Sequence, residues 1–251
     1  MPVIEANGIR LNVQVKGDGP PVVMVHGAFV GSLASWYLTV APALTRQRQV
    51  VLYDLRGHGK SDRPTSGYDA ATMAADLDTV ASASCSAPFA LVGHSYGALI
   101  AIRYTLDHPE KVARLSILDA PLPPGEMRTF EEFLRRTPEE LIASLPPATR
   151  LMVRLGGRRV RKFIESIQFL AFETNLTKDI LAASEISDEA LGKIGCPVLC
   201  IYGENSPCLP AGKRLLAAIR SSRLDIVPGG HFVHVEAKKQ VTQKLLEFLD
   251  G

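Results

Sequence analysis

A serine between two glycines is the first feature of this sequence that could do chemistry. The stretch Gly93-His94-Ser95-Tyr96-Gly97 fits the G-x-S-x-G pattern of a nucleophile elbow. An apolar run at 89–92 precedes it and an Ala- and Leu-rich run at 96–106 follows it, which predicts a turn from a buried strand into a helix. Gly93 and Gly97 leave room for such a turn, because they carry no Cβ. The serine hydroxyl is therefore expected to stand above the sheet, beside the N-terminus of a helix.

A second motif follows another apolar run. The residues at 22–25 suit a strand that is covered on both faces, and His26-Gly27-Ala28-Phe29 comes directly after them. A His-Gly turn at the end of a buried strand is a position where an acyl-transfer enzyme places one N–H of an oxyanion hole. The alternative interpretation is an ordinary glycine turn, and the presence of the elbow favours the first.

Strand and helix patterns alternate along most of the chain. Besides the runs already named, strands are expected within 3–15 (two strands joined by an Asn-Gly turn), 50–53, 114–119, 197–203 and 224–227. Helices are expected at 36–44, 69–83, 211–220 and 237–249. This alternation predicts an α/β fold whose mostly parallel sheet is covered by helices on both faces. Ligands of such sheets bind beyond the carboxyl ends of the strands, which is where His26, Ser95, Asp119, Glu204 and His231 fall.

The sequence changes character between residues 122 and 193. This stretch begins with a Pro- and Gly-rich hinge and then has helical periodicity without a convincing strand. Its candidate helices are 129–136, 138–144, 161–173 and 179–185. We therefore expect a helical cap at 122–193, inserted into a core made of residues 1–121 and 194–251.

Taken together, these features resemble the α/β-hydrolase fold family. The resemblance rests on the elbow, the His-Gly turn, the polar loop 54–64 (DLRGHGKSDRP) and a Gly-Gly-His near the C-terminus. It covers the expected core and implies a mostly parallel, eight-stranded sheet with an inserted helical cap. It also implies that Ser95 is the nucleophile, that His231 is its general base, and that the amides of Ala28 and Tyr96 form the oxyanion hole.

The third member of the implied triad departs from the family's common pattern. The acid usually follows the strand after the cap, but here that segment reads Gly203-Glu204-Asn205-Ser206-Pro207, with a serine where the aspartate is expected. Three interpretations stay open, of which we favour the first. Asp119 occupies an alternative acid position at the end of the preceding strand, Glu204 reaches across from its own loop, or the site has no acid at all.

The leading hypothesis is a hydrolase of a small carboxylic ester or thioester that works through an acyl-Ser95 intermediate and needs no cofactor. A serine at the elbow argues against the family's dehalogenases and epoxide hydrolases, which need a carboxylate there. One alternative is a C–C bond hydrolase or cofactor-free lyase or oxygenase in which His231 and Asp119 supply the base. Another is a ligand-binding protein without turnover. Aromatic side chains expected to contact a small-molecule substrate are Phe29, His94, Phe130, Phe163 and Phe169.

Composition narrows the partners. The 251 residues include 46% hydrophobic and 22% charged residues with a net charge of +2, which is typical of a globular protein. We expect no nucleic-acid partner, because no basic run is interleaved with aromatic residues, and no membrane partner, because no stretch reaches about 18 apolar residues. Without a recognisable signal peptide, the expected location is cytoplasmic. The sequence sets no oligomeric state.

The four cysteines predict neither a disulfide nor a metal site. Cys196 and Cys200 are expected on one strand, roughly 13 Å apart at the rise of a strand, which is too far for a disulfide. No Cys or His pair has ligand spacing. Cys85, Cys196, Cys200 and Cys208 are therefore expected to be free thiols.

Overall fold

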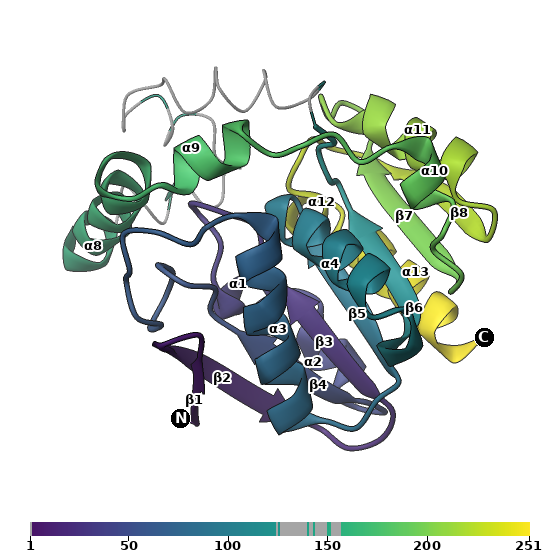
Figure 1. Cartoon of the computed structure of the whole chain (residues 1–251), viewed down its shortest axis with the longest axis horizontal. Helices are drawn as coiled ribbons and strands as arrows, with labels where there is room; N and C mark the ends of the chain where they lie inside the picture. Colours follow the sequence, from purple (N-terminus) through teal and green to yellow (C-terminus); the bar gives the residue numbers. More distant parts are fainter. Residues whose placement is uncertain (1, 124, 126–139, 141–142, 144–149, 152–156) are drawn as a thin grey trace.

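The computed structural model describes residues 2–123, 125, 140, 143, 150–151 and 157–251, and for 158–161 it describes the backbone. Among these residues, eight strands form one sheet in the order β1-β2-β4-β3-β5-β6-β7-β8 (Figure 1). β2 pairs antiparallel with both β1 and β4, and all other neighbours are parallel. The predicted mostly parallel, eight-stranded sheet is therefore confirmed. The strands are β1 (Val3–Ala6), β2 (Ile9–Lys16), β3 (Pro21–Val25), β4 (Gln49–Tyr53), β5 (Phe89–His94), β6 (Val112–Leu118), β7 (Val198–Gly203) and β8 (Ser222–Val227).

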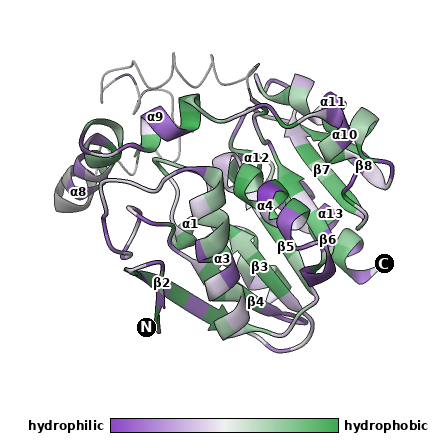
Figure 2. Cartoon of the chain, in the orientation of Figure 1, coloured by the Kyte–Doolittle hydropathy of each residue, from purple (hydrophilic) through white to green (hydrophobic). Residues whose placement is uncertain are grey.

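Helices connect the strands and cover both faces of the sheet, as the alternating pattern predicts. The central strands are mainly hydrophobic, whereas the helices and loops also carry hydrophilic residues (Figure 2). The helices in the described ranges are α1 (Leu33–Tyr37), α2 (Ala41–Leu44), α3 (Ala70–Ser84), α4 (Tyr96–Asp107), η1 (Pro109–Lys111), α8 (Gly157–Gln168), η2 (Phe169–Glu173), α9 (Leu176–Leu181), α10 (Asp188–Leu191), α11 (Leu209–Ala218), α12 (Val233–Glu236) and α13 (Lys238–Asp250).

The sheet separates two hydrophobic cores, and successive residues of β3 enter different ones. Val23 and Val25 belong to the core beneath α3 and α4. Val22 and Met24 belong to the core beneath α1, α2 and α13. A strand that is buried on both faces needs an unbroken apolar run rather than an alternating one, which explains why this strand was predictable from four consecutive apolar residues.

Three expected helices differ in extent or continuity from the observed ones. The run 36–44 is broken into α1 and α2, because Pro42 has no N–H to donate inside a helix and instead takes a place in the first turn of α2. The helix expected at 179–185 is α9, which begins earlier because the Thr174 hydroxyl accepts a hydrogen bond from the amide of Leu176 at 3.1 Å. The helix expected at 161–173 is α8 followed by the π-helical turn η2. The helices expected at 129–136 and 138–144 lie outside the described residues, apart from residues 140 and 143.

The segment between β6 and β7 contacts the polar loop that follows β4. The amide of Tyr68 donates to the Asp179 carboxylate at 3.0 Å, and the amide of Asn175 donates to the carbonyl of Thr65 at 2.8 Å. The Arg63 guanidinium lies 4.1 Å from the ring centroid of Phe169. These contacts attach η2 and α9 to the loop. The division into a core and a cap at 122–193 stays a prediction.

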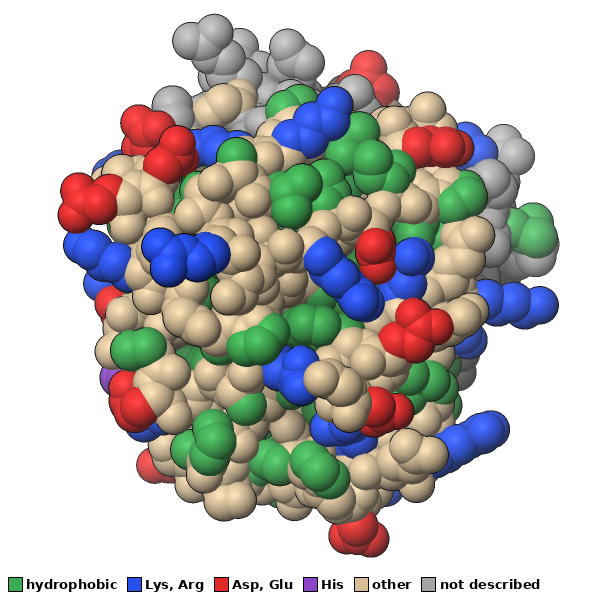
Figure 3. Space-filling model, turned by 90° about the vertical axis from the view of Figure 1, so that its right-hand side faces the viewer, with side chains coloured by type: hydrophobic (Ala, Val, Ile, Leu, Met, Phe, Trp, Pro, Cys, Tyr) green, Lys and Arg blue, Asp and Glu red, His purple; other side chains and the backbone are tan. Residues whose placement is uncertain are grey.

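The surface on the side of β8, α10 and α11 has basic and acidic side chains interspersed (Figure 3). Arg214 of α11 pairs with Asp188 at 2.8 Å and with Glu185 at 3.2 Å. These ion pairs link α11 to α10 and to the residues just before α10. Pairs of this kind on an exposed surface contribute little to stability. No helix in the described parts of the chain is long and apolar enough to cross a membrane.

The turn from β5 into α4 brings the helix close to the neighbouring strand β3. A Cβ built on Gly97 would lie 2.3 Å from the carbonyl oxygen of His26 and 2.6 Å from that of Val25. These are backbone atoms of a buried strand end, which cannot move aside without disturbing the sheet. Gly97 therefore sets how closely the elbow approaches the His-Gly turn.

We expect Gly97→Ala to destabilise the fold, since overpacking of a buried contact costs about 1–3 kcal/mol. For a chain of this size that corresponds to a fall in melting temperature of roughly 2–4 °C per kcal/mol, measurable by scanning calorimetry. Gly195→Ala is the matched control, because a Cβ built there meets no atom within 4 Å. Equal melting temperatures for the two variants would contradict the packing argument.

Candidate active site

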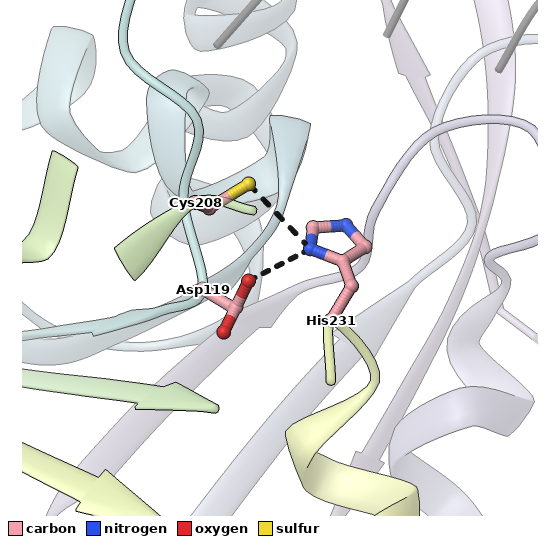
Figure 4. Close-up of side chains that lie close together, drawn as sticks. All are labelled: Asp119, Cys208 and His231. Atoms are coloured by element: carbon pink, nitrogen blue, oxygen red, sulfur yellow. Dashed lines mark hydrogen bonds and ion pairs between the residues drawn. The ribbon is translucent and has the colours of Figure 1, made fainter. Parts of the chain in front are cut away.

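Three side chains from three loops at the carboxyl edge of the sheet form one hydrogen-bonded chain. Ser95 lies between β5 and α4, Asp119 follows β6, and His231 lies between β8 and α12. Nδ1 of His231 is 2.8 Å from Oδ1 of Asp119 (Figure 4). On the other side of the ring, its Nε2 is 2.9 Å from Oγ of Ser95. The serine hydroxyl therefore has a base within reach, and the base has a carboxylate that fixes its tautomer with the proton on Nδ1.

The Asp119 carboxylate is completely buried and is held by donors besides His231. Its Oδ2 accepts the amide of Gly203 at 2.8 Å, and its Oδ1 accepts the hydroxyl of Ser206. The Ser206 hydroxyl in turn accepts the amide of Cys208 at 3.1 Å. A buried carboxylate is tolerated only when its lone pairs are used, so these donors hold Asp119 in the orientation that meets His231.

Among the three readings of the acid, the geometry brings Asp119 and not Glu204 to His231. Glu204 is exposed, and its carboxylate accepts the side-chain amide of Asn205 at 3.4 Å. Ser206 occupies the position where the family's aspartate is expected, and its hydroxyl donates to the carboxylate of Asp119. The serine is visible in the sequence but its role is not, because the contact depends on the register between β6 and β7.

The loop after β3 lies against Ser95. A Cβ built on Gly27 would lie 3.0 Å from Cβ of Ser95, a tight contact, so a larger residue at position 27 would push the loop and the elbow apart by a few tenths of an ångström. Phe29 has a φ of +62°, and the amide of Val30 donates to the carbonyl of Ala28 at 2.8 Å, which makes a tight γ-turn centred on Phe29.

The amides of Ala28 and Phe29, which are neighbours in this turn, differ in whether they already have a hydrogen-bond acceptor. The amide of Phe29 donates to Nε2 of His58 at 2.9 Å and is thereby used. The structure gives the amides of Ala28 and Tyr96 no acceptor among the described residues. Tyr96 is the first residue of α4, where amides have no partner within the helix. Both amides named from the sequence therefore have no acceptor among the described residues, and their role in an oxyanion hole stays a prediction.

Two buried histidines beneath this loop are held in defined tautomers. Nε2 of His26 accepts the amide of Leu55 at 3.0 Å, and its Nδ1 donates to the carbonyl of Gly27 at 2.8 Å. His58 accepts from Phe29 and donates from Nδ1 to the carbonyl of Arg56 at 2.7 Å. Burial lowers the pKa of His26 to about 4, and burial together with the neighbouring His26 lowers the pKa of His58 to about 3. Both rings are therefore neutral supports of the loop.

His94 lies beneath His231 and packs against His234. It is buried, its Nε2 donates to the carbonyl oxygen of His231 at 2.9 Å, and its ring centroid is 4.3 Å from that of His234. Burial, with His234 and His231 nearby, lowers the pKa of His94 well below its usual value. This placement gives no support to the prediction that His94 contacts substrate. Instead the side chain holds the backbone of His231, a role that sequence analysis missed.

The other residues expected at the pocket have mixed placements. The Phe29 side chain is buried in the core beneath α3 and α4. Phe163 in α8 and Phe169 in η2 are half-buried. Phe130 lies outside the described residues. Contact of these side chains with a substrate stays a prediction.

The chain is similar in sequence and in structure to known proteins. A family model described as the alpha/beta hydrolase fold matches residues 20–148. A protein of Synechocystis sp. provisionally named a non-heme chloroperoxidase is 30% identical over 93% of this chain and 92% of its own. One of Klebsiella pneumoniae subsp. pneumoniae provisionally named the carbamate hydrolase RutD is 32% identical over 90% of this chain and 91% of its own. The crystal structure of the enol-lactonase from Burkholderia xenovorans LB400 superposes with a TM-score of 0.80 at 20% identity, covering 100% of both chains, and supports the fold alone.

The two neutral histidines make stability depend on pH. The unfolded chain takes up a proton at each histidine below about pH 6.5, while the folded chain holds His26 and His58 neutral down to about pH 4 and 3. Their contribution is therefore complete above about pH 6.5 and is lost as the pH falls towards those lower values, at about 1.4 kcal/mol per histidine and pH unit.

We expect His58→Gln to reduce the loss of unfolding free energy between pH 7.5 and 5.0 by about 2 kcal/mol, although the variant is less stable at pH 7.5. Urea denaturation at the two pH values measures this difference. His108→Gln is the control, since it removes a histidine outside the buried cluster. If His58→Gln loses as much unfolding free energy between pH 7.5 and 5.0 as the wild type, protonation of His58 does not cause the acid destabilisation.

Proposed function

The chain belongs to the α/β-hydrolase fold family, and on this premise we propose that it is a serine hydrolase that cleaves a small carboxylic ester or thioester through an acyl-Ser95 intermediate. The observation that carries the proposal is the chain of hydrogen bonds from Ser95 through His231 to Asp119, with lengths of 2.9 and 2.8 Å. The relatives named as a carbamate hydrolase, an epoxide hydrolase and a dehalogenase support a hydrolase as the class of enzyme.

Each group of the site has one task in this reaction. Oγ of Ser95 attacks the acyl carbon while Nε2 of His231 takes its proton, and Asp119 stabilises the imidazolium that results. The tetrahedral oxyanion accepts hydrogen bonds from the amides of Ala28 and Tyr96. His231 then gives its proton to the leaving alcohol or thiol. A water activated by the same imidazole hydrolyses the acyl-enzyme and restores Ser95.

The elbow residue favours this chemistry over that of some relatives. The relatives named as a soluble epoxide hydrolase and a fluoroacetate dehalogenase match only 51% and 47% of this chain, and enzymes of those classes need a carboxylate where this chain has Ser95. The relative named as a carbamate hydrolase matches 90% of the chain. Cleavage of a carbamate is also attack at a carbonyl carbon, so a carbamate ester is a second candidate substrate for the same site.

Two alternatives use fewer of these groups. A C–C bond hydrolase or cofactor-free lyase or oxygenase would need His231 and Asp119 as its base and Ser95 only for positioning. A ligand-binding protein without turnover would not need Ser95, His231 and Asp119 to be hydrogen-bonded to one another. The proposal accounts for the serine–histidine hydrogen bond and for both available amides together, which is why we prefer it.

Treatment with a fluorophosphonate tests whether Ser95 is activated. We expect intact-mass spectrometry to detect one adduct on the wild type and none on Ser95→Ala. Ser116→Ala is the matched control, because it removes another buried serine hydroxyl, in β6, and should still be labelled. Absence of an adduct on folded wild-type protein would reject the acyl-enzyme mechanism and favour the His231-based or ligand-binding alternatives.

Asp119→Asn is expected to lower kcat for a p-nitrophenyl ester by roughly 10⁴-fold, as in other triads whose acid becomes an amide. The physical reason is that an amide no longer holds the His231 proton on Nδ1. Glu204→Gln is the control and should leave kcat within about twofold, since its carboxylate lies in solvent away from His231. Steady-state kinetics of both variants at one pH decides the matter, and the reverse order would assign the acid to Glu204.

A further inference from the structure

A thiol lies beside the pair of residues that hold the catalytic proton. Cys208, at the N-terminus of α11, has its Sγ 3.8 Å from Nδ1 of His231, and that nitrogen is 2.8 Å from Oδ1 of Asp119 (Figure 4). The sulfur, nitrogen and oxygen atoms all lie within 4.8 Å of one another. Thiolate, imidazole and carboxylate are together the donor set that zinc-like ions take.

We propose that Asp119, Cys208 and His231 form a binding site for a soft divalent cation of the Zn²⁺ and Cd²⁺ class, and that the bound ion inactivates His231. Sequence spacing gives no sign of such a site, because its ligands come from three separate segments. The binding half of the proposal is independent of the reaction catalysed, whereas the inhibition half rests on the proposed function.

The three ligand atoms can surround a single ion after the side chains of Cys208 and His231 adjust. Zinc lies about 2.3 Å from sulfur and about 2.0–2.1 Å from nitrogen or oxygen, so a tetrahedral ion separates its sulfur and nitrogen ligands by roughly 3.5 Å and its nitrogen and oxygen ligands by roughly 3.3 Å. The observed separation of sulfur and nitrogen is 3.8 Å and that of nitrogen and oxygen is 2.8 Å. The sulfur and oxygen atoms lie within 4.8 Å of each other, against roughly 3.5 Å around one tetrahedral ion. The Cys208 side chain therefore has to approach Asp119 while the partly exposed ring of His231 moves away from the carboxylate.

Charge balance favours an ion at this depth. The Cys208 thiol releases its proton to solvent on binding, and thiolate and carboxylate together neutralise the divalent ion. Since Asp119 is fully buried and Cys208 nearly so, a neutral assembly avoids the cost of an unpaired charge. Mg²⁺ and Ca²⁺ prefer oxygen ligands, and Mg²⁺ gives up its water reluctantly, so neither is expected to compete.

Binding would remove the base from the reaction. An ion on Nδ1 uses the lone pair of that nitrogen, so the proton that Nδ1 held leaves and one proton is carried on Nε2, with the ring still neutral. Nε2 then donates a hydrogen bond and has no lone pair to accept the Ser95 proton. The same ion displaces the hydrogen bond between His231 and Asp119. Ser95 is left without activation until the ion dissociates.

Direct binding of Cd²⁺ tests the site, with the metal ion alone as probe. Isothermal titration and the ultraviolet charge-transfer absorption of a cadmium thiolate are expected to report one ion per chain for the wild type. Removing one ligand of three, in Cys208→Ser or His231→Asn, should weaken binding by roughly tenfold or more. Cys196→Ser is the matched control, because it removes another thiol, half-buried and outside this cluster, and should bind like the wild type.

The outcomes separate a three-ligand site from simpler explanations. Unchanged binding in Cys208→Ser would overturn the site, and unchanged binding in His231→Asn would reduce it to a lone thiol and overturn it too. If Cys208→Ser does not fold, as judged by circular dichroism, Cys208→Ala takes its place. No binding to the wild type at millimolar Cd²⁺ would also reject the proposal.

Fluorophosphonate labelling of Ser95 tests the inhibition. Cd²⁺ should slow labelling of the wild type and of Cys196→Ser, with much less effect on Cys208→Ser when each is compared with its own rate without metal. Equal slowing in Cys196→Ser and Cys208→Ser would overturn the inhibition. If the wild type is not labelled even without Cd²⁺, the proposed function fails while the titrations still decide the metal site.

Discussion

The buried carboxylate of Asp119 is the constraint on which the arrangement of the site depends. A carboxylate without exposed surface is costly unless donors surround it, and here the donors come from three segments: the amide of Gly203 at the end of β7, the hydroxyl of Ser206 in the loop after it, and Nδ1 of His231. One charge therefore ties together two loops that are distant in sequence. The orientation of His231, and through it the hydrogen bond to Ser95, follows from satisfying that charge.

Backbone strain is concentrated around the same point. Phe29, Ser95 and Asp119 have positive φ values of 62°, 54° and 48° without being glycine. Each such residue costs on the order of 1–3 kcal/mol and persists only where its surroundings hold it. All three amides are held, by Nε2 of His58 and by the carbonyls of Leu118 and Ile201, at 2.9 Å in each case. The neutral His58 ring and the two neighbouring strands thus stabilise the conformations that aim the functional groups.

The parts of this protein that follow local patterns were predictable, and those that follow tertiary register were not. Buried strands have continuous apolar runs and the elbow has two glycines, so both could be predicted from the sequence. The break between α1 and α2, just before Pro42, was not predicted. Asp119 and Glu204 both follow strands, so the sequence pattern fits either as the acid. Which of them contacts His231 depends on how the ends of β6 and β7 pack together. The positions of Cys208 and of the ring of His94 depend on loop packing, for which the sequence has no periodic signal.

The exchange of the acid has a simple geometric basis. β6 and β7 are parallel neighbours, with Leu118 in register with Ile201, so their carboxyl ends open onto the same side of His231. An acidic side chain at position 206 would lie beside the Asp119 carboxylate, since the Ser206 hydroxyl that stands there donates to its Oδ1. The substitution of serine for the expected aspartate thus avoids two adjacent carboxylates, which would repel each other, and converts the vacated position into support for the acid that replaces it.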